Sequence, residues 1–191
     1  MTTESTLRAW VDESGSDWAQ DPGTYVLAAA VGRTEAEPTI RDQISRLRLP
    51  GQVKLHWRDE DAKRRAAITH AVAGYDLEHL VVVRAGAIDD RPERRRRKCL
   101  ERLLYELETT AVADVVLESR GPADDRRDIQ MLNALRGQRY LSTGIRLTHV
   151  VGRLEPMLWI PDAVCGAITS ARTGDPDHRT ALESRLTLIE I

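Results

Sequence analysis

The sequence lacks the features that mark secreted, membrane-spanning and zinc-binding proteins. Its two cysteines, Cys99 and Cys165, lie far apart and form neither a CxxC pair nor another zinc-binding spacing. No apolar run approaches the length of a membrane span, and the first residues, MTTESTLR, lack the apolar core of a signal peptide. We therefore expect a reduced, cytoplasmic protein that is not associated with a membrane.

The sequence also lacks the short motifs of several common enzyme classes. It contains no GxSxG, no P-loop and no GxGxxG, which argues against serine-hydrolase, nucleotide-driven and dinucleotide chemistry. The net charge is −2 and the isoelectric point about 6.2, so the chain as a whole is not a polycation. Binding to DNA or RNA would therefore need a local basic patch or a metal ion.

The composition that remains is typical of a soluble globular protein. Apolar residues make up 41% and charged residues 30% of the chain. A length of 191 residues favours one domain spanning 1–191, which can bury a core without disulfides or structural metals. No internal repeat, low-complexity tract or linker divides it.

Strand-like and helix-like patterns alternate along the chain. Strands are predicted at 7–12, 25–31, 53–57, 79–88, 114–118 and 145–151, and the tail LTLIEI can add one more. Helices are predicted at 38–49, 60–73, 92–110, 124–137 and 161–172. The first two strands are expected to form a β-hairpin. The alternation predicts an α/β domain in which helices flank a mixed sheet.

Acidic residues stand at the ends of these predicted elements. Asp12 and Glu13 close the first strand, Glu118 closes the strand DVVLE, and Asp162 follows Pro161 at the start of the last helix. Singly, each has a simpler explanation: turn chemistry, solvation or a favourable interaction with the helix dipole. Together, converging carboxylates are the ligands that hard divalent ions prefer, and such ions can drive phosphodiester hydrolysis.

Five segments together resemble a known family. WVDESGS, YVLAAAVG, VKLHW, VVLESR and IPDAVCGAI are similar to the proteins called domain of unknown function 3800, over roughly residues 9–172. The resemblance implies a ribonuclease H-like mixed sheet flanked by helices, with an insertion at about 38–73 after the hairpin. It implies that Asp12, Glu118 and Asp162 are catalytic and bind Mg²⁺ or Mn²⁺, in an arrangement similar to that of resolvases that cut branched DNA.

The sequence departs from the family pattern at three places. Ser16 stands where the family often has Asp, and Glu118 stands where Asp is frequent. The residues before Asp162 are Trp-Ile-Pro rather than a segment like Gln-x-Ala. These departures leave metal binding as the expectation and leave the activity open, and the resemblance does not supply a substrate.

Other residues are candidates for supporting roles. Glu13 is predicted to be an auxiliary ligand, or a supporting group that points to the opposite face of the sheet. His56 can act as a ligand, a proton shuttle or a phosphate contact, or can be a structural histidine beside Trp57. A basic patch on the third and fourth predicted helices is a candidate nucleic-acid-binding surface, the alternative being solvated helix starts. It comprises Arg94, Arg95, Arg97, Lys98, Arg126 and Arg127.

The leading hypothesis is a metal-dependent nuclease acting on DNA or RNA. One alternative is a non-catalytic ribonuclease H-like module that works with a protein partner in phage defence, a toxin system or a mobile element. Another is a metal-independent phosphodiesterase centred on His56. Homodimer formation is left open. The discriminating feature is whether Asp12, Glu118 and Asp162 converge within reach of one metal site.

Overall fold

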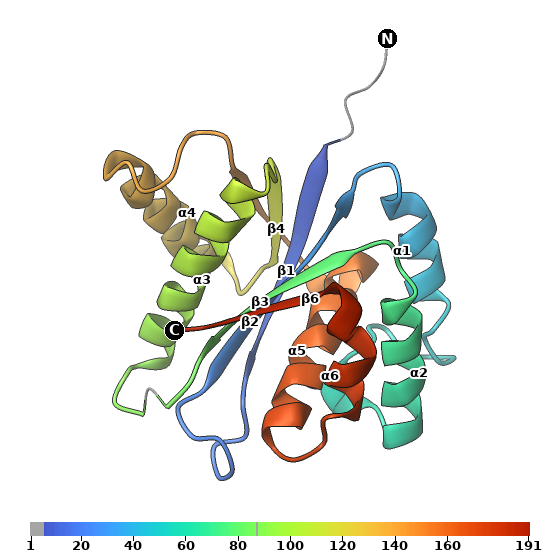
Figure 1. Ribbon diagram of the computed structural model, residues 1–191. Helices are drawn as coiled ribbons and strands as arrows, with labels where there is room; N and C mark the ends of the chain where they lie inside the picture. Colours follow the sequence, from blue (N-terminus) through green and yellow to red (C-terminus); the bar gives the residue numbers. More distant parts are fainter. Residues whose placement is uncertain (1–5, 87) are drawn as a thin grey trace.

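A mixed sheet forms the centre of the computed structural model, which describes residues 6–86 and 88–191 (Figure 1). Its strands are β1 (Leu7–Gly15), β2 (Tyr25–Arg33), β3 (Glu78–Arg84), β4 (Asp114–Glu118), β5 (Arg146–Val150) and β6 (Leu186–Glu190). The strand order is β5-β4-β1-β2-β3-β6. β1, β2 and β3 pair antiparallel, β4 is parallel to β1 and β5, and β6 is parallel to β3. The sheet is therefore mixed, as predicted.

Helices cover both faces of the sheet (Figure 1). They are α1 (Glu37–Ser45), α2 (Ala62–Ala73), α3 (Pro92–Thr109), α4 (Pro122–Gly137), α5 (Trp159–Arg172) and α6 (Asp177–Leu182). α3 and α4 pack on one face, and α1, α2, α5 and α6 on the other. None of the helices in the described ranges is long and apolar enough to cross a bilayer.

The alternation of side chains along β1 decides which residues meet which layer of helices. Trp10 belongs to the core under α5, whereas Ala9 and Val11 belong to the core under α3 and α4. Because successive side chains of a strand point to opposite faces, Asp12 follows Trp10 toward α5, and Glu13 follows Val11 toward α3. The prediction that Glu13 points to the opposite face is confirmed.

β1 is longer than the sequence suggested. The expectation that the strand stops at Asp12 is wrong, because β1 pairs with β2 as far as Gly15, which is opposite Tyr25. Beyond Val11, the pairing with β2 alone carries β1 past the acids. On the other edge β4 pairs with β1 between Arg8 and Val11.

Other boundaries also differ from the predicted ones, among them the end of the helix predicted at 38–49, which lies at Ser45. The segment 53–57 is not a strand, because none of the strands in residues 6–86 and 88–191 pairs with it; Leu55 and Trp57 are instead buried in the helix-covered core. Trp57 instead begins a short 3₁₀ turn, Trp57–Asp59. The strand predicted at 79–88 ends at Arg84, and position 87 lies outside the described residues. α5 starts at Trp159, so Asp162 still lies in its first turn.

His79 on β3 makes the stability of the fold depend on pH. Its ring is buried, and neither nitrogen has a hydrogen-bond partner among the described residues. Burial, helped by the charge of Arg185, lowers the pKa of His79 to about 4. The unfolded chain therefore binds the proton more tightly than the folded chain does. The free energy of unfolding keeps its full His79 contribution above pH 6.5 and falls as the pH drops toward 4.

Replacing His79 by leucine is expected to reduce this sensitivity to acid. Between pH 7 and pH 4 the parent chain should lose about 3 kcal/mol more unfolding free energy than the His79→Leu variant. Urea denaturation at several pH values measures the difference. The exposed His70 provides the control, and His70→Leu should keep the parent's pH profile. Equal pH slopes in the parent and His79→Leu would contradict the assignment.

Candidate functional site

Three elements bring the predicted acids to one face of the sheet. β1 supplies Asp12 and β4 supplies Glu118, and the two strands are parallel neighbours whose register runs to the pair Val11 and Leu117. α5 packs across β1, with the thiol of Cys165 3.4 Å from the carbonyl oxygen of Asp12. Its first turn places Asp162 close enough to Asp12 for the two carboxylates to interact electrostatically.

The pKa of Asp12 is perturbed by its position in an acid cluster, which we define as Asp12, Glu118 and Asp162. Only 8% of Asp12 is exposed. Burial raises the pKa of Asp12 well above its ordinary value, and the negative charges of Asp162 and Glu118 raise it further. A hydrogen bond from the backbone N–H of Glu13 to Oδ1, 2.8 Å long, acts in the opposite direction. The cluster therefore carries more negative charge than its surroundings balance, and a cation would stabilise it.

Asp162 is held by the segment that precedes the 3₁₀ turn. Its Oδ2 accepts a hydrogen bond from the backbone N–H of Trp57 at 2.8 Å, and Nδ1 of His56 lies 3.0 Å from Oδ1. The bond to Asp162 raises the pKa of His56 above its ordinary value. His56 is thus a neighbour of the acid cluster. The sequence alone did not decide between this position and a purely structural one.

The small residues of α5 allow this arrangement. A Cβ atom added at Gly166 would lie 2.2 Å from Cγ of Trp57, so only glycine lets the indole ring rest on the helix. Trp57 in turn fixes the turn whose N–H binds Asp162. Gly166 therefore supports the site through the packing of Trp57.

Glu118 is paired with a residue that sequence reasoning did not single out. The Nζ atom of Lys54 lies 2.8 Å from each carboxylate oxygen of Glu118. Burial opposes the charge on Lys54, but Glu118, Asp12 and Asp162 together raise its pKa above the ordinary value. Nothing in the segment VKLHW marks Lys54 as a site residue, because no local pattern shows that this loop reaches β4.

The geometry gives a mixed answer on metal binding. The donor set is suitable, because three carboxylates on two strands and a helix are the oxygen ligands that Mg²⁺ and Mn²⁺ prefer. However, across residues 6–86 and 88–191 no three His, Cys, Asp or Glu side chains are grouped closely enough to hold a metal ion as they stand. The Glu118 carboxylate instead contacts Lys54, and the Asp162 carboxylate contacts His56 and the backbone N–H of Trp57.

Glu13 lies on the other side of β1 from the acid cluster. Its Oε2 accepts a hydrogen bond from Nε of Arg96 on α3 at 2.5 Å, and Arg120 lies 3.6 Å from its Oε1. The predicted role of auxiliary metal ligand is therefore not supported by its position. Glu13 instead joins β1 to the α3 and α4 layer.

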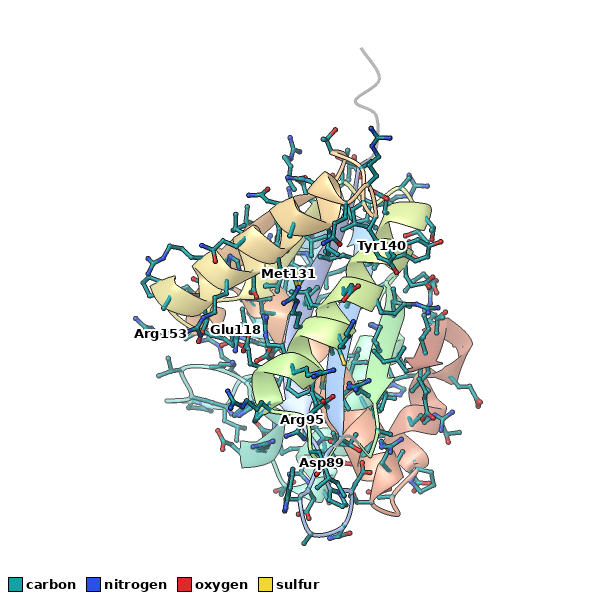
Figure 2. All side chains as sticks on the ribbon, turned by 90° about the vertical axis from the view of Figure 1, so that its left-hand side faces the viewer. Asp89, Arg95, Glu118, Met131, Tyr140 and Arg153 are labelled. Atoms are coloured by element: carbon teal, nitrogen blue, oxygen red, sulfur yellow. The ribbon has the colours of Figure 1, made fainter. Side chains whose placement is uncertain are left out.

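Two members of the predicted basic patch, Arg97 on α3 and Arg127 on α4, line one cleft of about 320 Å³ together with acidic residues, Glu93 and Asp128. Figure 2 views α3 and α4, which carry the patch, from outside the face opposite the acid cluster. Arg95 is buried and stacks on Trp18, so its assignment as a nucleic-acid contact is wrong. The other five are exposed on their helices. Three of them pair with nearby acids: Arg94 with Asp90, Lys98 with Glu101 and Arg127 with Asp124.

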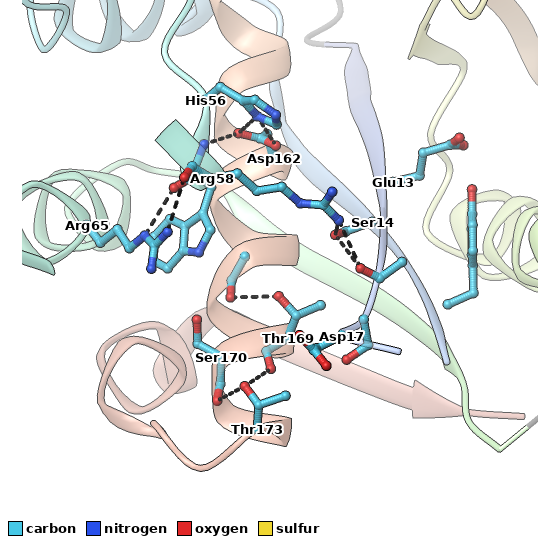
Figure 3. A pocket seen from close by; sticks show the side chains of 15 residues that line it. Glu13, Ser14, Asp17, His56, Arg58, Arg65, Asp162, Thr169, Ser170 and Thr173 are labelled. Atoms are coloured by element: carbon cyan, nitrogen blue, oxygen red, sulfur yellow. Dashed lines mark hydrogen bonds and ion pairs between the residues drawn. The ribbon is translucent and has the colours of Figure 1, made fainter. Parts of the chain in front are cut away.

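A cleft of about 630 Å³ opens beside the acid cluster and is lined by His56 and Asp162 (Figure 3). Arg58 reaches across it, and its Nη2 donates to the carbonyl oxygen of Gly15 at 3.1 Å. Arg65 also lines the cleft, with Nε bonded to the carbonyl oxygen of Trp57 at 3.0 Å. Both arginines were missed by sequence reasoning, because neither belongs to a charge run or a motif.

Comparison with known proteins establishes the fold. No family model and no curated protein matches the chain. A solved structure, the crystal structure of Bst-RNase HIII in complex with Mn²⁺, matches with a TM-score of 0.54 at 12% identity. The chain has a ribonuclease H-like fold. The match covers 90% of this chain but 54% of the other, so the chain spans about half the length of that ribonuclease.

The predicted fold class is therefore confirmed: a ribonuclease H-like α/β domain with a mixed sheet flanked by helices. An identity of 12% speaks for the fold alone and not for the activity. Membership of the family called domain of unknown function 3800 stays a prediction, since no family model matches.

Proposed function

We propose that the chain is a divalent-metal-dependent nuclease that hydrolyses phosphodiester bonds of DNA or RNA, and that it belongs to the family called domain of unknown function 3800. The observation that carries the proposal is the burial of Asp12 beside Glu118 and Asp162 on one face of a ribonuclease H-like sheet. The negative charges of Glu118 and Asp162 add to burial in raising the pKa of Asp12, so its ionised form is costly, and a bound divalent ion would offset that cost.

The residues of the chain would divide the work as follows. Asp12, Glu118 and Asp162 would hold Mg²⁺ or Mn²⁺, and the bound metal would supply an activated water and stabilise the leaving oxygen. His56 holds Asp162 in place through its hydrogen bond. Arg58 and Arg65 line the adjoining cleft and offer guanidinium groups to the phosphates of a strand.

A cleavage assay tests this proposal. The purified chain is incubated with Mn²⁺ or Mg²⁺ and a panel of RNA, RNA–DNA hybrid, single-stranded, duplex and branched DNA. We expect cleavage of at least one substrate that stops on addition of EDTA. Cleavage that survives EDTA would favour the metal-independent reaction centred on His56. An absence of cleavage across the panel would contradict the nuclease proposal.

One observation favours a second candidate. As they stand, Glu118 contacts Lys54 and Asp162 contacts His56, and the three acids are not grouped for a metal ion. That arrangement is compatible with a non-catalytic ribonuclease H-like module that acts with a protein partner. The two candidates differ in whether Mn²⁺ binds at millimolar concentration, which calorimetry measures directly.

Gly152 provides a test of Glu118 that leaves the acid itself unchanged. A Cβ atom at position 152 would lie 2.1 Å from Oε1 and 2.3 Å from Cδ of Glu118, so Gly152→Ala forces the carboxylate to move. Because the end of a glutamate side chain is flexible, we expect a change in stability of less than about 1 kcal/mol. Metal-dependent cleavage should fall by about tenfold or more.

Gly137→Ala is the matched control, because a Cβ atom there has nothing within 4 Å. It should preserve both stability and cleavage. If Gly152→Ala also preserves cleavage, the position of the Glu118 carboxylate is not important for the reaction.

A further inference from the structure

Lys54 occupies the place of a cation in the acid cluster. Its ammonium group contacts both oxygens of Glu118 at 2.8 Å, and the negative charges of Asp12 and Asp162 act on it as well. Its side chain is 23% exposed, and that of Glu118 25%. A single positive group therefore touches one acid of the cluster and balances part of the charge of the other two.

Lys54 cannot keep its contacts with both oxygens of Glu118 while a divalent ion binds that carboxylate. A metal ion binds a carboxylate oxygen at about 2.1 Å, much closer than the Lys54 contact, and it repels an ammonium group held on the same carboxylate. Entry of the ion at Glu118 therefore requires Lys54 to release at least one of the two oxygens. This requirement explains why the suitable donor set is not grouped around one point among the described residues.

The local structure lets the side chain move while the backbone stays. Lys54 lies in an irregular segment between α1 and the 3₁₀ turn, and its neighbour Val53 is 64% exposed. The next residue, Leu55, is fully buried and Trp57 is nearly so, which anchors the segment. A change of rotamer at Lys54 is thus sufficient to free Glu118.

The residue type fits an exchangeable cation. Of the 28 lysines and arginines in the chain, only three are lysines: Lys54, Lys63 and Lys98. An arginine at position 54 could hold both oxygens of Glu118 in a rigid fork, whereas an ammonium on a flexible stem is a point charge that can leave.

We propose that Lys54 is an exchangeable internal cation, which holds the acid cluster together without metal and leaves Glu118 when a divalent ion binds. The inference rests on the proposed function, because it assumes that the cluster takes a metal. Lys54 is then a positioning residue that sets the metal affinity of the site. A substitution that removes the charge strengthens metal binding, and one that fixes the charge weakens it.

Titration of Mn²⁺ into the whole chain, followed by calorimetry, tests the affinity. Lys54→Met is expected to bind Mn²⁺ about tenfold or more tightly than the parent, and Lys54→Arg more weakly. In EDTA, Lys54→Met should be less stable than the parent, and added Mn²⁺ should raise its melting temperature by more. Lys63→Met, at an exposed position on α2, is the control and should match the parent in both measurements.

Amine acylation followed by mass spectrometry gives a readout that does not depend on substitution. Lys54 should react slowly compared with Lys63 and Lys98, and saturating Mn²⁺ should raise its reactivity while the other two stay constant. Unchanged Lys54 reactivity in a chain that binds Mn²⁺ at the cluster overturns the inference.

The failures of the two proposals are distinguishable. If the parent binds Mn²⁺ and Lys54→Met binds it equally or more weakly, the exchange is wrong and the metal site remains. If neither the parent nor Lys54→Met binds Mn²⁺, both the exchange and the metal-dependent function are wrong.

Discussion

Replacing Arg96 by methionine is expected to lower the free energy of unfolding by about 3–5 kcal/mol. The side chain of Arg96 is 3% exposed, and its guanidinium group binds the Glu13 carboxylate on β1 and both oxygens of Asp128 on α4. Loss of the guanidinium removes the closest cation from the buried Asp128 and from the partly exposed Glu13, which keep only His149 and the more distant Arg120. Removing one member of a buried ion pair is far more costly than removing an exposed charge.

Arg97 offers a matched control on the same helix. It is the next residue of the same arginine run, but its side chain is exposed. Arg97→Met should change the unfolding free energy by less than about 0.5 kcal/mol. Urea denaturation of both variants gives the comparison. Similar effects of the two substitutions would show that the buried pairing with Glu13 and Asp128 does not hold the layers together.

Replacing Asp12 by asparagine is expected to remove metal-dependent cleavage while making the chain more stable. Residues that only support metal ligands already change activity by about 10–100-fold, so losing a proposed ligand should reduce cleavage by about 100-fold or more. The stability change has the opposite sign, because the ionised Asp12 is repelled by Asp162 and Glu118 in a buried position.

The sign follows from the raised pKa of Asp12. When a carboxylate binds its proton more tightly in the folded chain, the free energy of unfolding falls as the pH rises from the unfolded pKa, about 3.9, through the folded pKa. An asparagine side chain has no such titration, so at neutral pH without metal the Asp12→Asn variant should unfold at higher urea concentration than the parent. Function and stability oppose each other at such sites.

The exposed Asp42 provides the control for both measurements, since it pairs with Arg46 on the surface of α1. Asp42→Asn should keep full cleavage and show a stability change of less than about 0.5 kcal/mol. Cleavage that survives in Asp12→Asn would refute the proposed ligand, and a destabilised Asp12→Asn would refute the electrostatic argument.

The sheet and its helices were largely predictable because their apolar periodicity is strong. Alternation along β1 placed Asp12 and Glu13 on opposite faces, and the leucines of α3 indicated its buried side. The tail LTLIEI was confirmed as β6. The segment 53–57 misled because its apolar residues are buried singly by tertiary contacts, without pairing to any strand among the described residues.

The surroundings of the acids were much harder to predict than the acids. Lys54 and Arg58 act through partners distant in sequence, Glu118 and Gly15, and no local spacing encodes such contacts. Within the arginine run only the buried Arg95 was wrongly assigned to the patch, which did not include Arg96. A helix turns its residues to different sides, so one run contains a buried structural arginine, Arg96, and an exposed one, Arg97.

The most direct test of the account is the position of manganese in crystals of the chain soaked in Mn²⁺. An anomalous difference map should show manganese within about 2.5 Å of carboxylate oxygens from Asp12, Glu118 and Asp162. Lys54 should then have left Glu118. A map with manganese only elsewhere, or with none while Lys54 still contacts both oxygens of Glu118, would contradict the central claim that these three acids form a metal site.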